Sequence, residues 1–236
     1  MTILLEAAQA RSIGARDVTA RPSQRRHAAD PTATAHARVC RAFEVRAAET
    51  ASPIIEGFAS VTGISYEMYD MFGPYSELVA VDAFDKTLAS SPLVEFTLNH
   101  GAGGGIPMAH TRNDTLTLSV VKDAEETGLW YAAAVDPTRH DVSDVVKATT
   151  RRDLAESSFK FMIVRGQWSP DWTEYHILEV DINRGDVSAV NFGANPYATT
   201  GVREAQQAAA RVAFAAADTA RRIMISEADT RPRFLV

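Results

Sequence analysis

The chain has 236 residues, of which 46% are hydrophobic and 23% are charged, and its formal net charge at pH 7 is −6. This composition is ordinary for a soluble globular protein, and the length allows one sizeable domain with tails or two small domains. The negative charge argues against a general nucleic-acid binder, and no apolar run reaches the roughly 18 residues of a membrane-spanning helix.

The first 52 residues are rich in Ala, Arg and Thr, and residues 1–50 carry eight arginines against five acidic residues. We predict a poorly ordered leader here. The aliphatic run in "MTILLEAAQAR" is too short for the core of a signal peptide. The single cysteine, Cys40, excludes an internal disulfide and fits a reducing compartment, and its place in the leader argues against a catalytic thiol.

Residues 53–198 carry nearly all the aromatic and β-branched side chains and read as short strands. Leu116, Leu118 and Val120, for example, alternate with Thr and Ser, as a half-buried antiparallel strand requires. Helices are predicted at 83–88 and at 144–154, where Asp141 or Ser143 can act as the cap. The predicted strands are 54–61, 77–81, 93–98, 115–121, 129–135, 158–164, 174–182 and 186–192.

This pattern predicts a mainly β fold with flanking helices, built as a closed or nearly closed antiparallel β-barrel, with a sandwich as the alternative. Residues 199–236 are strongly helix-favouring and Ala-rich, so we predict a helical C-terminal extension that docks on the core, pairs with a partner or remains mobile. The chain then divides into a leader (1–52), a β domain (53–198) and this extension.

The glycine-rich stretch "HGAGGGIPMAH" resembles a phosphate-binding loop only superficially. A P-loop ends in Gly-Lys-Ser/Thr before a helix, whereas Ile106-Pro107 and a strand-like segment follow here, so we reject nucleotide binding. His100 and His110 are ten residues apart without a third ligand in a recognised spacing, which makes a metal site a weak hypothesis. We therefore predict no metal and no cofactor.

His100 ends an alternating strand and opens the glycine loop, which is a suitable position for a general base. Ser158 begins a strand after the second helix, and a serine hydroxyl becomes a nucleophile when an imidazole takes its proton. Asp186, at the start of the last strand, could orient that imidazole. Each of these three residues also fits a purely structural role, and sequence spacing alone does not distinguish that role from the catalytic one.

Six ordered blocks across residues 53–198 resemble the HK97-type phage prohead (capsid maturation) serine proteases. The blocks are "IIEGFASV", "ELVAVDAFDKTL", "VEFTLNH", "LTLSVVKDAEETGLWYAAAVD", "ESSFKF" and "LEVDINRGDVSAVNFGANPYA". The resemblance implies a fold similar to the herpesvirus assemblins, with His100 as base, Ser158 as nucleophile and Asp186 as the third member. The mechanism also requires oxyanion donors, for which backbone N–H groups near the glycine loop are a hypothesis that the sequence does not place.

The sequence departs from the family pattern at four points. Asp82 and Gly101 replace the usual Gly and Asp, Lys160 stands where a small residue is common, and Asp186 replaces a Glu. If Asp186 does not serve as the acid, Asp181 or Glu179 is next.

The resemblance implies that the chain cleaves capsid or scaffold segments, and itself, inside the immature phage shell in the bacterial cytoplasm. Nucleic acid and membrane are not expected partners, and a homo-oligomer is left open. The rival reading is a catalytically inactive assembly module of the same fold that binds capsid or scaffold protein. A small-ester hydrolase is disfavoured because the chain lacks a G-x-S-x-G elbow.

Overall fold

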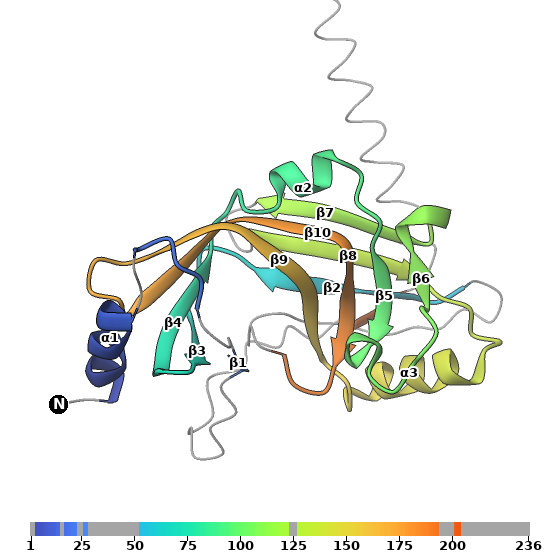
Figure 1. Ribbon diagram of the computed structural model, residues 1–236. Helices are drawn as coiled ribbons and strands as arrows, with labels where there is room; N and C mark the ends of the chain where they lie inside the picture. Colours follow the sequence, from blue (N-terminus) through green and yellow to red (C-terminus); the bar gives the residue numbers. More distant parts are fainter. Residues whose placement is uncertain are drawn as a thin grey trace, which may run out of the picture.

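The computed structural model describes residues 3–14, 17–22, 26–27, 52–122, 127–193 and 201–203 (Figure 1). The helices are α1 (Ile3–Gly14), α2 (Asp85–Ala89) and α3 (His140–Arg151), with short 3₁₀ turns at Asn99–Gly101 and Thr111–Asn113. The strands are β1 (Arg26–His27), β2 (Ile54–Val61), β3 (Tyr66–Asp70), β4 (Gly73–Val79), β5 (Glu95–Leu98), β6 (Ala109–His110), β7 (Leu116–Lys122), β8 (Thr127–Ala134), β9 (Glu156–Trp168), β10 (Glu174–Val190) and β11 (Gly201–Arg203).

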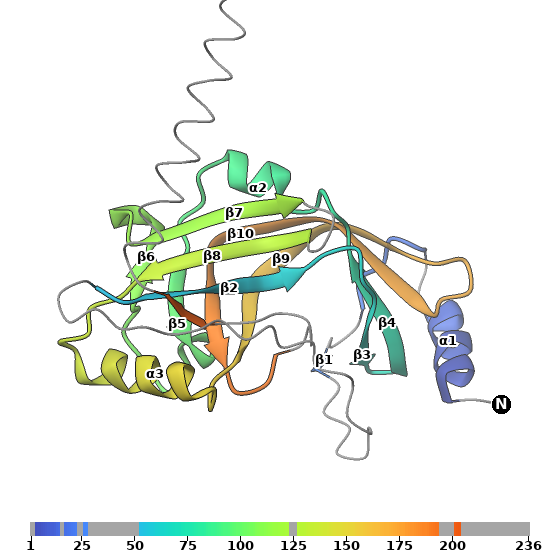
Figure 2. The same cartoon turned by 180° about the vertical axis from the view of Figure 1, so that it is seen from behind.

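The strands form two sheets, which lie one above the other (Figures 1 and 2). The larger sheet has the order β1-β3-β4-β10-β5-β6, with β9 paired to the other edge of β10, and the smaller has the order β11-β2-β8-β7. The prediction of a mainly β protein is therefore confirmed. The barrel is not, because no ladder joins the two sheets among the described strands.

Strand β10 explains why the larger sheet is not the antiparallel one that we predicted. It runs antiparallel to β9, but parallel to β4 at its beginning and parallel to β5 at its end. Register shifts between Asp181 and Asp186 bend it between these two neighbours. One 17-residue strand thus covers the strand predicted at 174–182 and residues 186–190 of the one predicted at 186–192.

The pairing of β5, β10 and β9 gives this part of the larger sheet one apolar and one polar face. Phe96, Val187 and Phe159 lie opposite one another and are buried in the core. Successive residues of a strand point to opposite faces. The next row, formed by Thr97, Ser188 and Ser158, therefore lies on the other face. The polar side chains of the candidate site come from this row and from the row of Asp186 and Lys160, which lies on the same face.

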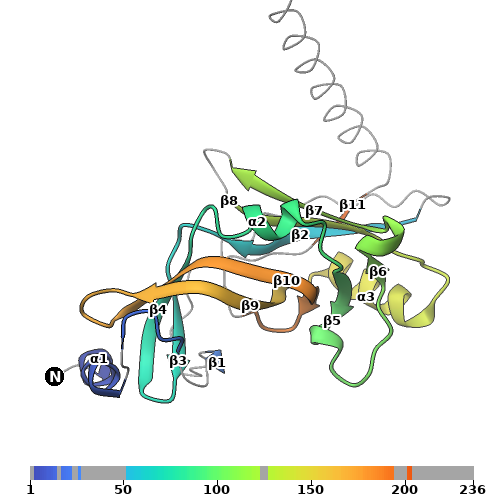
Figure 3. The same cartoon turned by 45° about the horizontal axis from the view of Figure 1, so that its top comes forward.

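Helix α1 lies within the predicted leader, and a buried arginine attaches it to the rest of the protein. Its Arg11 is fully buried and makes two hydrogen bonds to Asp70, of 2.8 and 3.0 Å. The guanidinium also donates to the carbonyl oxygens of Gly73 and Pro74, and it lies 5.1 Å from the ring centroids of both Tyr75 and Trp168. The arginine thus fixes the helix to the end of the molecule opposite α3 and β5 (Figure 3).

Replacing this arginine should destabilise the protein strongly. We expect Arg11→Ala to lower the free energy of unfolding by about 3–5 kcal/mol, because it leaves the Asp70 carboxylate buried without its counter-charge. Urea denaturation followed by tryptophan fluorescence measures the change. Gln9→Ala, an exposed position on the same helix, is the control and should change stability by no more than about 0.5 kcal/mol. Equal midpoints for the two variants would contradict the assignment.

The helix predicted for residues 199–236 lies outside the described residues, except that 201–203 form the short strand β11 on β2. The division of the chain into leader, β domain and extension stays a prediction. Within the described part of the chain, the helices are too short and polar to cross a membrane.

Candidate active site

The turn that carries His100 has an unusual backbone. Asn99, His100 and Gly101 all have positive φ, at 47°, 58° and 67°, and only glycine adopts this region without cost. Two hydrogen bonds hold the turn: the Asn191 N–H donates to Asn99 Oδ1 (3.0 Å), and the His100 N–H donates to Ser188 Oγ (3.1 Å). Backbone conformations of this kind cost about 1–3 kcal/mol per residue and gather at functional sites.

The side chains of His100 and Asp186 are hydrogen-bonded to each other. The distance from Nδ1 to Asp186 Oδ1 is 2.7 Å, and the carboxylate is almost completely buried whereas the imidazole is about one-third exposed. An imidazole that donates its Nδ1 proton to a carboxylate presents Nε2 as a proton acceptor. His100 therefore has the geometry of an oriented base with its second nitrogen available.

Two hydroxyl residues that the sequence analysis missed complete this arrangement. Ser188 Oγ donates to Asp186 Oδ1 (2.9 Å), accepts from the His100 backbone N–H, and shares a 2.5 Å hydrogen bond with Thr97 Oγ1. Ser188 is fully buried, so it fixes the carboxylate and the histidine backbone at the same time. Its spacing was an available signal, because a residue two positions after Asp186 on a strand shares its face.

The two neighbouring serines of β9 have different environments. Ser157 is fully buried and hydrogen-bonded to Tyr131 Oη at 2.8 Å. Ser158 lies directly opposite Ser188 in the β9–β10 register, is partly exposed, and its hydroxyl has no hydrogen-bond partner among the described residues. Opposed residues have Cβ atoms about 4.5–5.5 Å apart. Ser158 is therefore one strand from the His100–Asp186 network, although no hydrogen bond joins it to His100.

Lys160 is a further charged group at this site. It lies opposite Asp186 in the β9–β10 register, and its Nζ is 3.9 Å from Asp186 Oδ2 while the side chain stays mostly exposed. The two alternative acids are engaged elsewhere. Glu179 forms an ion pair with Lys86 at 2.9 Å, and Asp181 accepts from the Asn183 N–H at 2.8 Å.

The second histidine of the weak metal hypothesis has a local role. His110 Nδ1 accepts a hydrogen bond from the Arg112 N–H at 2.8 Å, at the start of the second 3₁₀ turn. Within the described ranges, no three side chains of His, Cys, Asp or Glu gather in a way that could hold a metal ion.

A buried carboxylate on an imidazole, with serine hydroxyls on the same and the adjacent strand, is the kind of arrangement that serine hydrolases use. The family comparison agrees with this class. The family model for the caudovirus prohead serine protease matches residues 41–211, and the chain belongs to this family. The resemblance stated from the sequence motifs is thereby confirmed. No curated protein and no solved structure gives a significant match.

Membership places the chain in a serine peptidase family whose members mature phage capsids. For such proteins, capsid or scaffold protein is the general substrate, and the phage capsid in the host cell is the place of action.

Proposed function

We propose that this chain is an active serine endopeptidase of prohead maturation, with Ser158 as nucleophile, His100 as general base and Asp186 as the residue that orients the base. The observation that supports this most is the 2.7 Å hydrogen bond between His100 Nδ1 and the buried Asp186 carboxylate, on the sheet face that Ser158 shares. Family membership supports the reaction class, and the register of β9 and β10 supports the choice of Ser158 over Ser157.

In the proposed reaction, His100 Nε2 takes the proton of the Ser158 hydroxyl as Oγ attacks the scissile carbonyl carbon. The tetrahedral intermediate collapses, the peptide C–N bond breaks, and the imidazolium gives its proton to the leaving amine. A water molecule, deprotonated by His100, then hydrolyses the acyl-enzyme and frees Ser158. Asp186 stabilises the imidazolium in each half of the cycle, and Ser188 holds the carboxylate in place.

The proposed substrates are scaffold or capsid protein segments, and the protease itself, inside the immature shell. Self-cleavage would act on the leader or on the segment beyond residue 198, because the strands β2 to β10 are hydrogen-bonded into sheets and cannot enter an active site as a free chain.

A serine-directed phosphonate tests this function directly. We expect one covalent adduct per chain, located on Ser158 by peptide mass spectrometry, because only a hydroxyl activated by a base reacts at an appreciable rate. His100→Ala should prevent labelling while the protein stays folded. An unlabelled wild-type chain, or an adduct on a different serine, would reject the proposal.

A second reading remains, in which the chain is an inactive assembly module. Two observations favour it: Lys160 Nζ lies 3.9 Å from Asp186 Oδ2, and His100 is not hydrogen-bonded to Ser158. An ammonium ion beside the carboxylate competes with the imidazolium for its charge. The module reading predicts binding to capsid or scaffold protein without cleavage and without labelling.

A further inference from the structure

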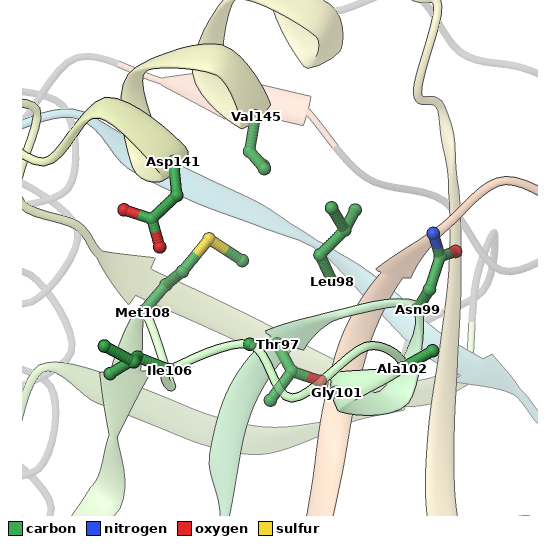
Figure 4. Close-up of a pocket in the computed structure, with 10 residues that line it drawn as sticks. Thr97, Leu98, Asn99, Gly101, Ala102, Ile106, Met108, Asp141 and Val145 are labelled. Carbon is green, nitrogen blue, oxygen red and sulfur yellow. The ribbon is translucent and has the colours of Figure 1, made fainter.

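A pocket of about 130 Å³ lies next to the His100 turn (Figure 4). Its walls come from the end of β5, the glycine loop and the first turns of α3. Asn99 and Gly101, the residues on either side of His100, both line it. The apolar part of the lining consists of Leu98, Ala102, Ile106, Met108 and Val145.

Each polar side chain of this lining makes at least one hydrogen bond within the protein. Thr97 Oγ1 bonds to Ser188, and Asn99 Oδ1 accepts from the Asn191 N–H. Asp141 receives two hydrogen bonds from Arg139, of 2.6 and 3.1 Å, and these hold the pKa of the Asp141 carboxyl below its ordinary value. Five apolar residues make up half of the lining, so a ligand side chain gains most here by burying apolar surface.

Arg139 also fixes one wall of the pocket. It donates to the carbonyl oxygens of Pro107 (2.8 Å) and Ile106 (3.2 Å), so that the end of the glycine loop is tied to the start of α3. A wall held in this way is pre-formed, which lowers the cost of binding.

Two large apolar side chains of the lining face solvent. Ile106 is 71% exposed and Leu98 is 38% exposed. Exposed aliphatic side chains that gather around a pocket mark a place where apolar surface of a partner is buried. The volume agrees with a single side chain, since an apolar cavity of about 150 Å³ accommodates benzene.

The pocket and the candidate nucleophile lie at the same end of the larger sheet, because Leu98 is the last residue of β5 and Ser158 lies near the start of β9. Thr97, Ser188 and Ser158 lie opposite one another on three adjacent strands, so the lateral separation is about 10 Å. Leu98 points to the other face of β5 from Thr97, so a substrate chain must also pass around the end of the sheet. At about 3.3 Å per residue, an extended peptide needs at least three residues to reach the pocket.

We propose that this pocket is a specificity subsite that binds an aliphatic side chain of the substrate, such as Leu, Ile or Met, three or more residues from the scissile bond. The proposal rests on the proposed function, because it takes Ser158 as the nucleophile. The recognised segment is thus an extended chain with an aliphatic anchor at a fixed distance from the cleaved bond.

Overlapping 20-residue peptides spanning the major capsid protein of the same phage serve as probes, and the cleaved peptide is then scanned with Leu, Ser and Glu on both sides of the bond. We expect one position, three or more residues from the bond, at which Leu raises kcat/KM by about 10-fold or more over Ser and Glu. Ala102→Phe, which fills the pocket, and Ile106→Ser, which removes its exposed wall, should abolish this preference. Met71→Ser, at a 60% exposed apolar position between β3 and β4, is the control and should retain it.

Binding is measured separately, with the Ser158→Ala protein and the methyl resonances of Leu98, Ile106, Met108 and Val145. Perturbation of these methyls by a peptide, without cleavage of that peptide by the wild type, would support the subsite and reject the peptidase. Cleavage without a side-chain preference, or with one that Ala102→Phe leaves unchanged, would overturn the subsite and leave the peptidase intact. Neither binding nor cleavage of any peptide would reject both.

Discussion

Ser158→Ala is expected to lower kcat for cleavage of the capsid or scaffold substrate by on the order of 10⁶-fold. The hydroxyl is the only atom group that the substitution removes from this face of β9, where Ser158 is partly exposed and opposite Ser188. Without it no acyl-enzyme forms, although substrate binding is retained. Single-turnover cleavage of purified capsid protein, followed by gel electrophoresis and mass spectrometry, measures the loss.

Ser157→Ala is the matched control for this experiment, because it removes the neighbouring hydroxyl from the opposite face of the same strand. It removes the 2.8 Å hydrogen bond to Tyr131 Oη, so we expect the free energy of unfolding to fall by about 0.5–1.5 kcal/mol. Turnover of the folded fraction should remain. The reverse pattern, with catalysis lost in Ser157→Ala and kept in Ser158→Ala, would make Ser157 the nucleophile.

The strands were predictable where their pattern was local. Leu116 to Val121 alternate as a half-buried strand does, and β7 covers this segment. The pairing of β10 was not predictable in this way, because its parallel partners β4 and β5 are brought to it by long connections rather than by hairpins. Arg11 was missed for another reason: arginine is normally exposed, and its burial depends on Asp70, 59 residues away.

The candidate site was predictable from the sequence only through the family motifs. His100 and Asp186 are 86 residues apart, and nothing in their spacing indicates the hydrogen bond between them. The supporting shell was not found, since Thr97 and Ser188 look like ordinary strand residues until the register places them beside each other. The departures from the family motif indicated more about the site. Lys160, one of these departures, has its Nζ 3.9 Å from Asp186 Oδ2, where it competes with the imidazolium for the charge of the carboxylate.

The acid is tested by Asp186→Asn, for which we expect a fall in kcat of about 10⁴-fold. The amide is nearly the same size, so the buried position remains filled and hydrogen-bonded to Ser188. It carries no negative charge, however, and its NH₂ group can hold the imidazole in the wrong tautomer. The imidazolium that forms during the reaction is then no longer stabilised. Steady-state kinetics together with thermal unfolding separate this loss from misfolding.

Glu95→Gln provides the matched control for the charge. Glu95 lies opposite Asp186 in the β5–β10 register and therefore on the same face of the sheet, but its carboxylate does not contact His100. The substitution removes one negative charge from the same surroundings, and we expect turnover to change by less than about 10-fold, because exposed or partly exposed charges interact weakly through water. If turnover falls by a similar factor in the two variants, the total negative charge near His100, rather than the 2.7 Å hydrogen bond to Asp186, supports catalysis. Normal turnover in Asp186→Asn would remove Asp186 from the mechanism altogether, and His100 would then act without an orienting acid.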